Sequence, residues 1–245
     1  LLYRRINWLN NDFKKQLISI IGAKNLLLND WEKKPFSNGW RYGSGTALAV
    51  VKPGNLTELW KVLDLCVKND LIIIMQAANT GLTGGSTPYG SDYDREVIII
   101  NTLRIDKIHL LNNGNEILAL AGSTLYDLEK KLLPLGREPH SVIGSTSIGA
   151  SIVGGVCNNS GGSLVKRGPA YTEMSLYAKI DKNGKLLLIN DLDIDLGKSP
   201  EEILYNLENE CFGKKDFLKS KKVSSNETYE KLVRNINSTK PARFN

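Results

Sequence analysis

Two stretches rich in glycine and small polar residues have the residue types expected of a ligand-binding site in this 245-residue sequence. The first, residues 76–87, reads Gln-Ala-Ala-Asn-Thr-Gly-Leu-Thr-Gly-Gly-Ser-Thr and directly follows the apolar run 71–75. Glycine lets the main chain approach a ligand closely, and successive backbone N–H groups can surround phosphate oxygens. Further neutral donors come from Asn79, Thr80, Ser86 and Thr87. This chemistry suits a pyrophosphate, although a surface turn that needs glycine only for its backbone angles has the same composition.

The second stretch, residues 144–163, is nearly free of charge and rich in Gly, Ser and Asn. Such a segment can pack its backbone against a flat ring and hydrogen-bond the carbonyls and nitrogens of that ring. A flexible linker has a similar composition. Apolar residues within the stretch favour an anchored loop instead, namely Ile148, Ile152, Val153 and Val156.

Other signatures of chemistry are absent from the sequence. No GxGxxG stands between a strand and a helix and no GxxxxGK[ST] occurs, which argues against a Rossmann site and a P-loop. HExxH and GxSxG are also absent, and no Ser-His-Asp set can be assigned from residue order. His109 and His140 are the only histidines, and the cysteines, Cys66, Cys157 and Cys211, lie far apart, so we expect no metal site and reduced cytosolic thiols. His140 is expected to be a hydrogen-bonded structural residue, with orientation of a ligand or loop as the alternative.

Hydrophobic patterning predicts an α+β fold. Helical spacing of apolar residues occurs at 11–22, 56–68, 125–133 and 199–209. Strand patterns occur at 47–51, 71–75, 97–101, 105–111, 116–121, 172–180 and 185–190. These elements predict a small three-layer unit with a parallel βαβ arrangement, followed by a larger mixed or antiparallel sheet with helices.

Local capping and turn signals support several of these boundaries. Ser123 or Thr124 can cap the helix that begins near residue 125. Ser199 followed by Pro200 is typical of a helix start. The pair Asn183-Gly184 suits a type I′ turn between the last two strands.

Charge and hydropathy limit the possible partners. No apolar run approaches the roughly 20 residues that a membrane-spanning helix needs. The first residue is Leu1 and no secretory signal follows, so we expect the sequence to be part of a longer protein. The net charge of +6 comes from residues 211–245, which hold nine Lys or Arg and three Asp or Glu. Contact with anionic lipid or nucleic acid is one interpretation of this tail, but a solvated segment is expected, and nucleic acid is not an expected partner.

Longer motifs resemble a known family of enzymes. They lie at residues 75–83, 85–88, 92–95, 135–145, 158–165 and 167–175. At these stretches the sequence resembles the respiratory D-lactate dehydrogenases, which reduce quinone and bind FAD in a PCMH-type domain of the vanillyl-alcohol-oxidase kind. The likeness runs from about residue 12 to the end of the sequence.

The resemblance implies a fold and a cofactor site. It implies a flavin domain of two α/β subdomains, residues 1–105 and 106–210, followed by the basic tail 211–245 that leads to a substrate and cap part absent from this sequence. It implies that FAD contacts Ala77, Ala78, Asn79, Thr80, Gly81, Gly85, Ser86, Gly144, Ser151 and Gly161. Relatives in the wider family attach FAD through a histidine in the first stretch, which this sequence lacks, so FAD is expected to bind noncovalently.

The resemblance also implies an activity. D-lactate would be oxidised to pyruvate and quinone would accept the electrons, in a protein bound peripherally to the cytoplasmic side of the inner membrane through parts absent here. No catalytic base is assigned in this sequence. Arg137 is expected to brace a loop, with contact to a carboxylate or the flavin ring as the alternative. A noncatalytic flavin-binding remnant is the alternative to an enzyme, and the preferred 2-hydroxy acid and quinone are not indicated.

Overall fold

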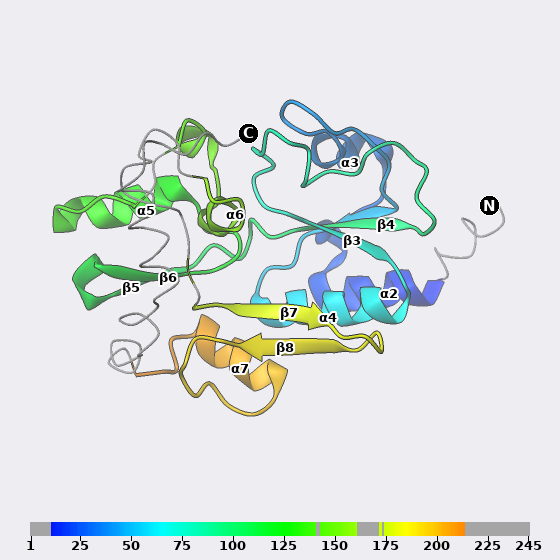
Figure 1. Cartoon of the computed structure of the whole chain (residues 1–245). Helices are drawn as coiled ribbons and strands as arrows, with labels where there is room; N and C mark the ends of the chain where they lie inside the picture. The colour runs from blue at the N-terminus through cyan, green and yellow to red at the C-terminus, as the bar shows by residue number, and fades with distance from the viewer. Residues whose placement is uncertain (1–10, 141–142, 161–171, 173, 214–245) are drawn as a thin grey trace. The chain divides into compact units, whose positions relative to one another are not determined.

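The computed structural model of the chain describes residues 11–140, 143–160, 172 and 174–213 (Figure 1). The chain divides into two compact units, Leu1–Ile105 with Lys182–Leu186 and Asp106–Asp181 with Leu187–Asn245. Most of the predicted basic tail, from residue 214 on, lies outside the described residues. The assignment of the three sequence ranges to separate functional parts stays a prediction.

The first unit is built on a four-stranded sheet in which β4 is an interior strand (Figure 1). The sheet has the order β1-β2-β4-β3 and contains β1 (Leu26–Leu27), β2 (Ala49–Val51), β3 (Ile72–Gln76) and β4 (Val97–Asn101). Strands β2 and β3 pair with β4 in parallel, and β1 pairs with β2 antiparallel. All residues of β4 are buried, because the strand has a neighbour on each edge and is covered on both faces. The predicted parallel βαβ arrangement is confirmed, with β4 inserted between its two strands.

Alternating side chains of β4 divide the core of this unit between two faces. The helices of the unit are α2 (Asn11–Ile21), η1 (Ala23–Asn25), α3 (Asp30–Ser37) and α4 (Leu56–Lys68). Ile98 and Ile100 pack in a cluster with residues of α2 and α4, while Val97 and Ile99 pack in a second cluster with Phe36 of α3. Successive side chains of a strand point to opposite faces, so one strand contributes to both layers. The predicted three-layer unit is therefore confirmed.

Three elements of the first unit, β1, η1 and α3, were not predicted from the sequence. Strand β1 is two residues long, and α3 is eight residues long with Pro35 in its interior. Short elements depend more on tertiary packing than on local propensity. One local signal was available, because Asn29 and Glu32 form a capping box in which the Asn29 backbone N–H donates to Glu32 Oε2 at 3.4 Å.

The second unit begins with a hairpin and a capped helix. Its elements are β5 (Ile108–Leu111), η2 (Asn112–Gly114), β6 (Glu116–Ala119), α5 (Leu125–Leu132), η3 (Leu133–Leu135), η4 (Thr146–Ile148), α6 (Ile152–Cys157), β7 (Leu176–Ile180), β8 (Leu186–Asn190) and α7 (Pro200–Glu208). Strands β5 and β6 pair antiparallel, as predicted. Thr124 is the residue that caps α5, because its Oγ1 accepts the Asp127 N–H at 3.1 Å. Ser123 instead donates its hydroxyl to the Leu120 carbonyl at 2.6 Å.

The pairing of strands in the second unit differs from the prediction. Instead of one larger sheet, the described residues contain two separate two-stranded sheets, β5–β6 and β7–β8. A hairpin pairs through its own local sequence, whereas the pairing of two hairpins into one sheet depends on packing between distant segments.

The predicted type I′ turn at Asn183-Gly184 is also wrong, because that turn needs positive φ at both central residues. Gly184 has φ of 77°, but Asn183 is not among the residues with positive φ.

The start of α7 agrees with the sequence signals. Ser199 Oγ accepts the Glu202 N–H at 3.2 Å, and Pro200 is the first residue of the helix. A proline is tolerated there because an N–H group in the first turn of a helix has no intrahelical partner, so its absence costs no hydrogen bond.

Within the described ranges, no helix combines the length and apolar content needed to cross a bilayer.

Cys66 of α4 is expected to be unreactive in the folded protein. Burial raises the pKa of its thiol to about 12, and only a thiolate attacks a disulfide reagent efficiently. Cys157 and Cys211 are exposed. Titration with Ellman's reagent near pH 8 should modify those two thiols rapidly and the third only after unfolding. Rapid modification of Cys66 in protein with an intact circular-dichroism spectrum would contradict the described packing of α4.

Candidate functional site

The first glycine-rich stretch forms a loop, residues 77–87, that begins where β3 ends. The last residue of β3, Gln76, is buried and ties this loop to α3. Its Nε2 donates to the Ser86 carbonyl and to the Phe36 carbonyl, each at 2.8 Å. Asn101, the last residue of β4, donates from Nδ2 to the Ala77 carbonyl at 2.9 Å. Two buried amide side chains at the ends of neighbouring parallel strands therefore fix both ends of the loop.

Several polar side chains of the loop are engaged within the protein. Ser86 Oγ donates to Asn79 Oδ1 at 2.8 Å, and Asn79 Nδ2 donates to the Asn38 carbonyl at 2.7 Å. Thr87 Oγ1 donates to the Gly84 carbonyl at 3.2 Å. Three of the four side chains that the sequence predicts as donors to a ligand, those of Asn79, Ser86 and Thr87, thus also brace the loop, and their contact with a ligand stays a prediction. A loop of small residues cannot hold its shape by apolar packing, so its own side chains supply the restraint.

The backbone of the loop, in contrast, keeps its donors available. Within the described part of the chain, the N–H groups of residues 78–86 have no hydrogen-bond partner. A Cβ added at Gly81 would meet no atom within 4 Å, and one at Gly85 would meet only Thr83 Oγ1, at 3.9 Å. The loop thus has open space beside Gly81 and Gly85 and backbone N–H groups without a partner in the described structure. These features fit an anion such as a pyrophosphate, as expected from the sequence.

A segment that the sequence did not indicate, residues 38–45, packs against the loop. Gly43 and Gly84 have φ of 89° and 76°, and a Cβ on Gly43 would lie 3.2 Å from the Gly84 Cα. Only glycine combines this backbone angle with so close an approach. The Gly90 N–H donates to the Ser44 carbonyl at 2.8 Å, which joins the segment 38–45 to the residues that follow the loop. The closely spaced Gly39, Gly43 and Gly45 were the sequence signal that could have indicated this segment.

The second glycine-rich stretch is described for residues 143–160 and belongs to the second unit. It contains regular structure, η4 and α6, rather than a flexible linker. Ser151 is buried and caps α6, because its Oγ accepts the Gly154 N–H at 3.1 Å. A Cβ at Gly144 would meet nothing within 4 Å. Gly161 lies outside the described residues, so a role of these three residues in cofactor binding stays a prediction.

Other residues singled out in the sequence make contacts within the protein. Arg137 Nε donates to the Asn113 carbonyl at 2.8 Å and so braces the β5–β6 turn, as expected. His109 is buried in β5, and its Nδ1 is hydrogen-bonded to Glu210 Oε1. His140 also has an interaction partner. No group of three or more His, Cys, Asp or Glu side chains suited to a metal ion occurs in the described ranges.

The fold is that of a known class of proteins. The chain is similar in structure to alkyldihydroxyacetonephosphate synthase, with a TM-score of 0.60 and 16% sequence identity over 81% of this chain and 38% of that chain. A parallel sheet that ends in a loop lined with backbone N–H groups is suited to a phosphate-containing cofactor. The chain belongs to the FAD binding domain family, whose sequence profile matches residues 47–188.

More similar relatives confirm the resemblance seen in the sequence. The chain is 55% identical over 236 residues to quinone-dependent D-lactate dehydrogenase of Escherichia coli, which covers 96% of this chain and 41% of the relative. It is 52% identical over 230 residues to the enzyme of the same name from Haemophilus influenzae, covering 94% of this chain and 41% of the relative. The chain thus spans about two fifths of the length of these relatives.

Proposed function

We propose that the chain binds FAD noncovalently and is the FAD-binding part of an enzyme that oxidises D-lactate to pyruvate with quinone as electron acceptor. The observation that carries FAD binding is that the N–H groups of residues 78–86 have no hydrogen-bond partner in the described structure. Side-chain hydrogen bonds hold the loop that carries them in place. The identity of 55% to a quinone-dependent D-lactate dehydrogenase supports the choice of reaction.

The residues of this chain have binding and orienting roles in the proposal. FAD, when bound, supplies the ring that accepts the hydride equivalent, and the protein positions that ring. The pyrophosphate is held by the first loop through Ala77, Ala78, Asn79, Thr80, Gly81, Gly85 and Ser86. Gly144, Ser151 and Gly161 of the second stretch contact the cofactor. The first loop contains no His, Cys or Tyr that could attach the flavin covalently.

The location follows from the proposed electron acceptor. Respiratory quinones are dissolved in the lipid phase, so an enzyme that reduces them must reach the membrane surface. We infer peripheral attachment on the cytoplasmic side of the inner membrane. The membrane contact is assigned to parts of the enzyme beyond this chain.

FAD binding can be tested on the 245-residue chain. After incubation with FAD and desalting, the protein should retain absorption bands at about 370 and 450 nm. Acid precipitation should then release the yellow colour into the supernatant, because the flavin is held noncovalently. A folded protein that retains no flavin after desalting would refute FAD binding by this chain, and colour that stays in the precipitate would refute noncovalent attachment.

The reaction can be tested on the complete enzyme. Under anaerobic conditions, D-lactate should bleach the flavin band at about 450 nm, since the reduced ring loses that absorption. L-lactate is the matched control and should leave the band in place. If another D-2-hydroxy acid bleached the band and D-lactate did not, the proposal of a flavin-dependent enzyme would stand and the proposal of D-lactate as its substrate would be wrong.

A further inference from the structure

Large aromatic side chains are exposed beside the proposed pyrophosphate loop. The exposed fraction is 65% for Tyr42 and 81% for Tyr89. Both residues lie on segments that are hydrogen-bonded to each other, because the Gly90 N–H donates to the Ser44 carbonyl and the Thr46 N–H donates to the Gly90 carbonyl. Two exposed tyrosines on adjoining segments next to a ligand-binding loop suggest a contact surface.

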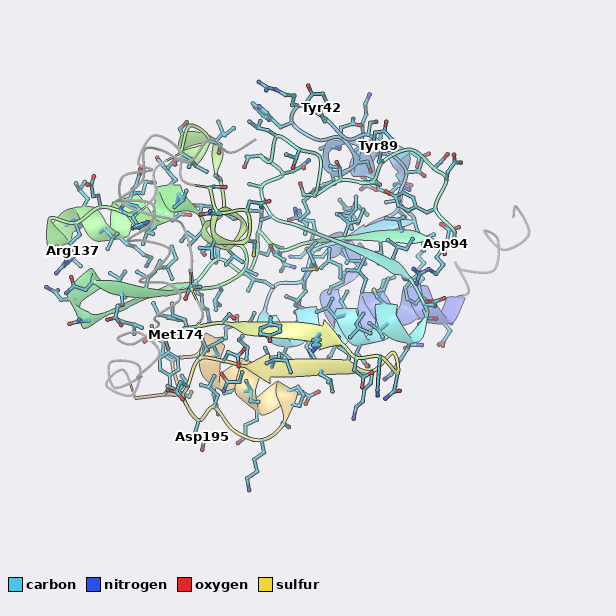
Figure 2. The ribbon with its side chains drawn as sticks, viewed as in Figure 1. Tyr42, Tyr89, Asp94, Arg137, Met174 and Asp195 are labelled. Atoms are coloured by element: carbon cyan, nitrogen blue, oxygen red, sulfur yellow. The ribbon has the colours of Figure 1, made fainter. Side chains whose placement is uncertain are left out.

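Backbone contacts fix the position of Tyr42 relative to the loop. A Cβ added at Gly84 would lie 3.0 Å from the Tyr42 carbonyl oxygen, so Tyr42 directly adjoins the loop that carries the free N–H groups. Figure 2 shows Tyr42 and Tyr89 at the end of the first unit that carries α3. The Tyr42 backbone therefore adjoins the loop, and the Tyr42 side chain is exposed.

The chemistry of FAD supplies a ligand for these tyrosines. A pyrophosphate held by residues 78–86 carries adenosine at one end and the flavin at the other. Aromatic side chains stack on flat heteroaromatic rings. The flavin must be shielded from water for hydride transfer, whereas the adenine takes no part in the reaction and tolerates an exposed position. The solvent-exposed tyrosines of the first unit therefore suit the adenine.

We propose that Tyr42 and Tyr89 form the contact surface for the adenosine end of FAD, with Tyr42 stacking on the adenine. This inference rests on the proposed function, because it requires FAD at the first loop. Tyr42 acts here as a binding residue. Its side chain is mostly exposed and its loop contact is made by the backbone, so its replacement should leave the fold intact.

The test compares FAD affinity of the 245-residue chain and its variants by fluorescence titration. Tyr42→Leu should weaken FAD binding about tenfold, and Tyr42→Phe, which keeps the ring, should restore it. Tyr205→Leu is the matched control, because Tyr205 is 60% exposed on α7 of the second unit. Thermal unfolding should show the same stability for all three variants and the wild type. Competition with ADP and with FMN then separates the two ends of the cofactor.

Each outcome has a distinct meaning. Tyr42→Leu should weaken ADP as much as FAD and leave FMN unchanged. Weakened FMN with unchanged ADP would overturn the adenosine assignment, and unchanged FAD affinity would overturn the contact, with the proposed function standing in both cases. A folded wild-type chain that binds no FAD would overturn the proposed function and this inference with it.

Discussion

Replacement of Gly81 by aspartate is expected to abolish FAD binding while leaving the fold intact. Gly81 is exposed, its φ is not positive, and a Cβ there would meet no atom within 4 Å. The new carboxylate would stand on the open side of the loop, where the proposal places the pyrophosphate. Two like charges in such a position cost several kcal/mol, so we expect FAD affinity to fall by about 100-fold or more in a desalting or titration experiment.

Gly81→Asn is the matched control for this charge effect. Asparagine has almost the same size and shape as aspartate but carries no charge, so most of the affinity should remain. Equal losses in both variants would indicate a steric effect instead of repulsion. Unchanged affinity in Gly81→Asp, with the wild type binding FAD, would show that the pyrophosphate does not lie at this loop.

The isosteric change Gln76→Glu should strongly destabilise the first unit. Nε2 of Gln76 donates to the carbonyls of Phe36 and Ser86, and the side chain is 2% exposed. The substitution leaves both carbonyls without a donor and places a carboxylate against them. A buried carboxylate that faces two carbonyl oxygens and has Asn101 Nδ2, at 3.3 Å, as its donor should cost about 3 kcal/mol, which should appear in urea unfolding at neutral pH. FAD affinity should fall as well, because the loop loses its restraint.

The pH dependence of this variant has a defined sign. Because it is buried and faces the carbonyls of Phe36 and Ser86, the new carboxyl should have a pKa in the folded state above the unfolded value of about 4.3. Its stability deficit should therefore be smallest below about pH 4.3 and grow as pH rises through the folded pKa. Gln16→Glu at an exposed position of α2 is the control and should change stability by only about 0.5 kcal/mol. A deficit of that small size in Gln76→Glu would contradict the described hydrogen bonds.

Local sequence determined most elements and the position of the first loop. Helices α2, α4, α5 and α7 follow helical spacing, and α4, α5 and α7 also have standard capping residues. Strands β3 and β4 follow continuous apolar runs. The loop after β3 was recognisable because glycine and small polar residues directly follow a continuous apolar run. Family membership was also readable, since the matching motifs are long and lie in a fixed order.

Tertiary structure alone decided how that loop is held and which of its atoms remain available. Gln76 reaches the carbonyl of Phe36, 40 residues away, and Asn79 reaches that of Asn38, 41 residues away. Local propensity contains no information on such contacts, which arise only when α3 and the segment 38–45 pack on the sheet. For the same reason the sequence did not reveal that the side chains of Asn79, Ser86 and Thr87 hydrogen-bond within the protein. The insertion of β4 between β2 and β3 likewise depends on packing of the whole sheet, because each strand by itself pairs equally well with several neighbours.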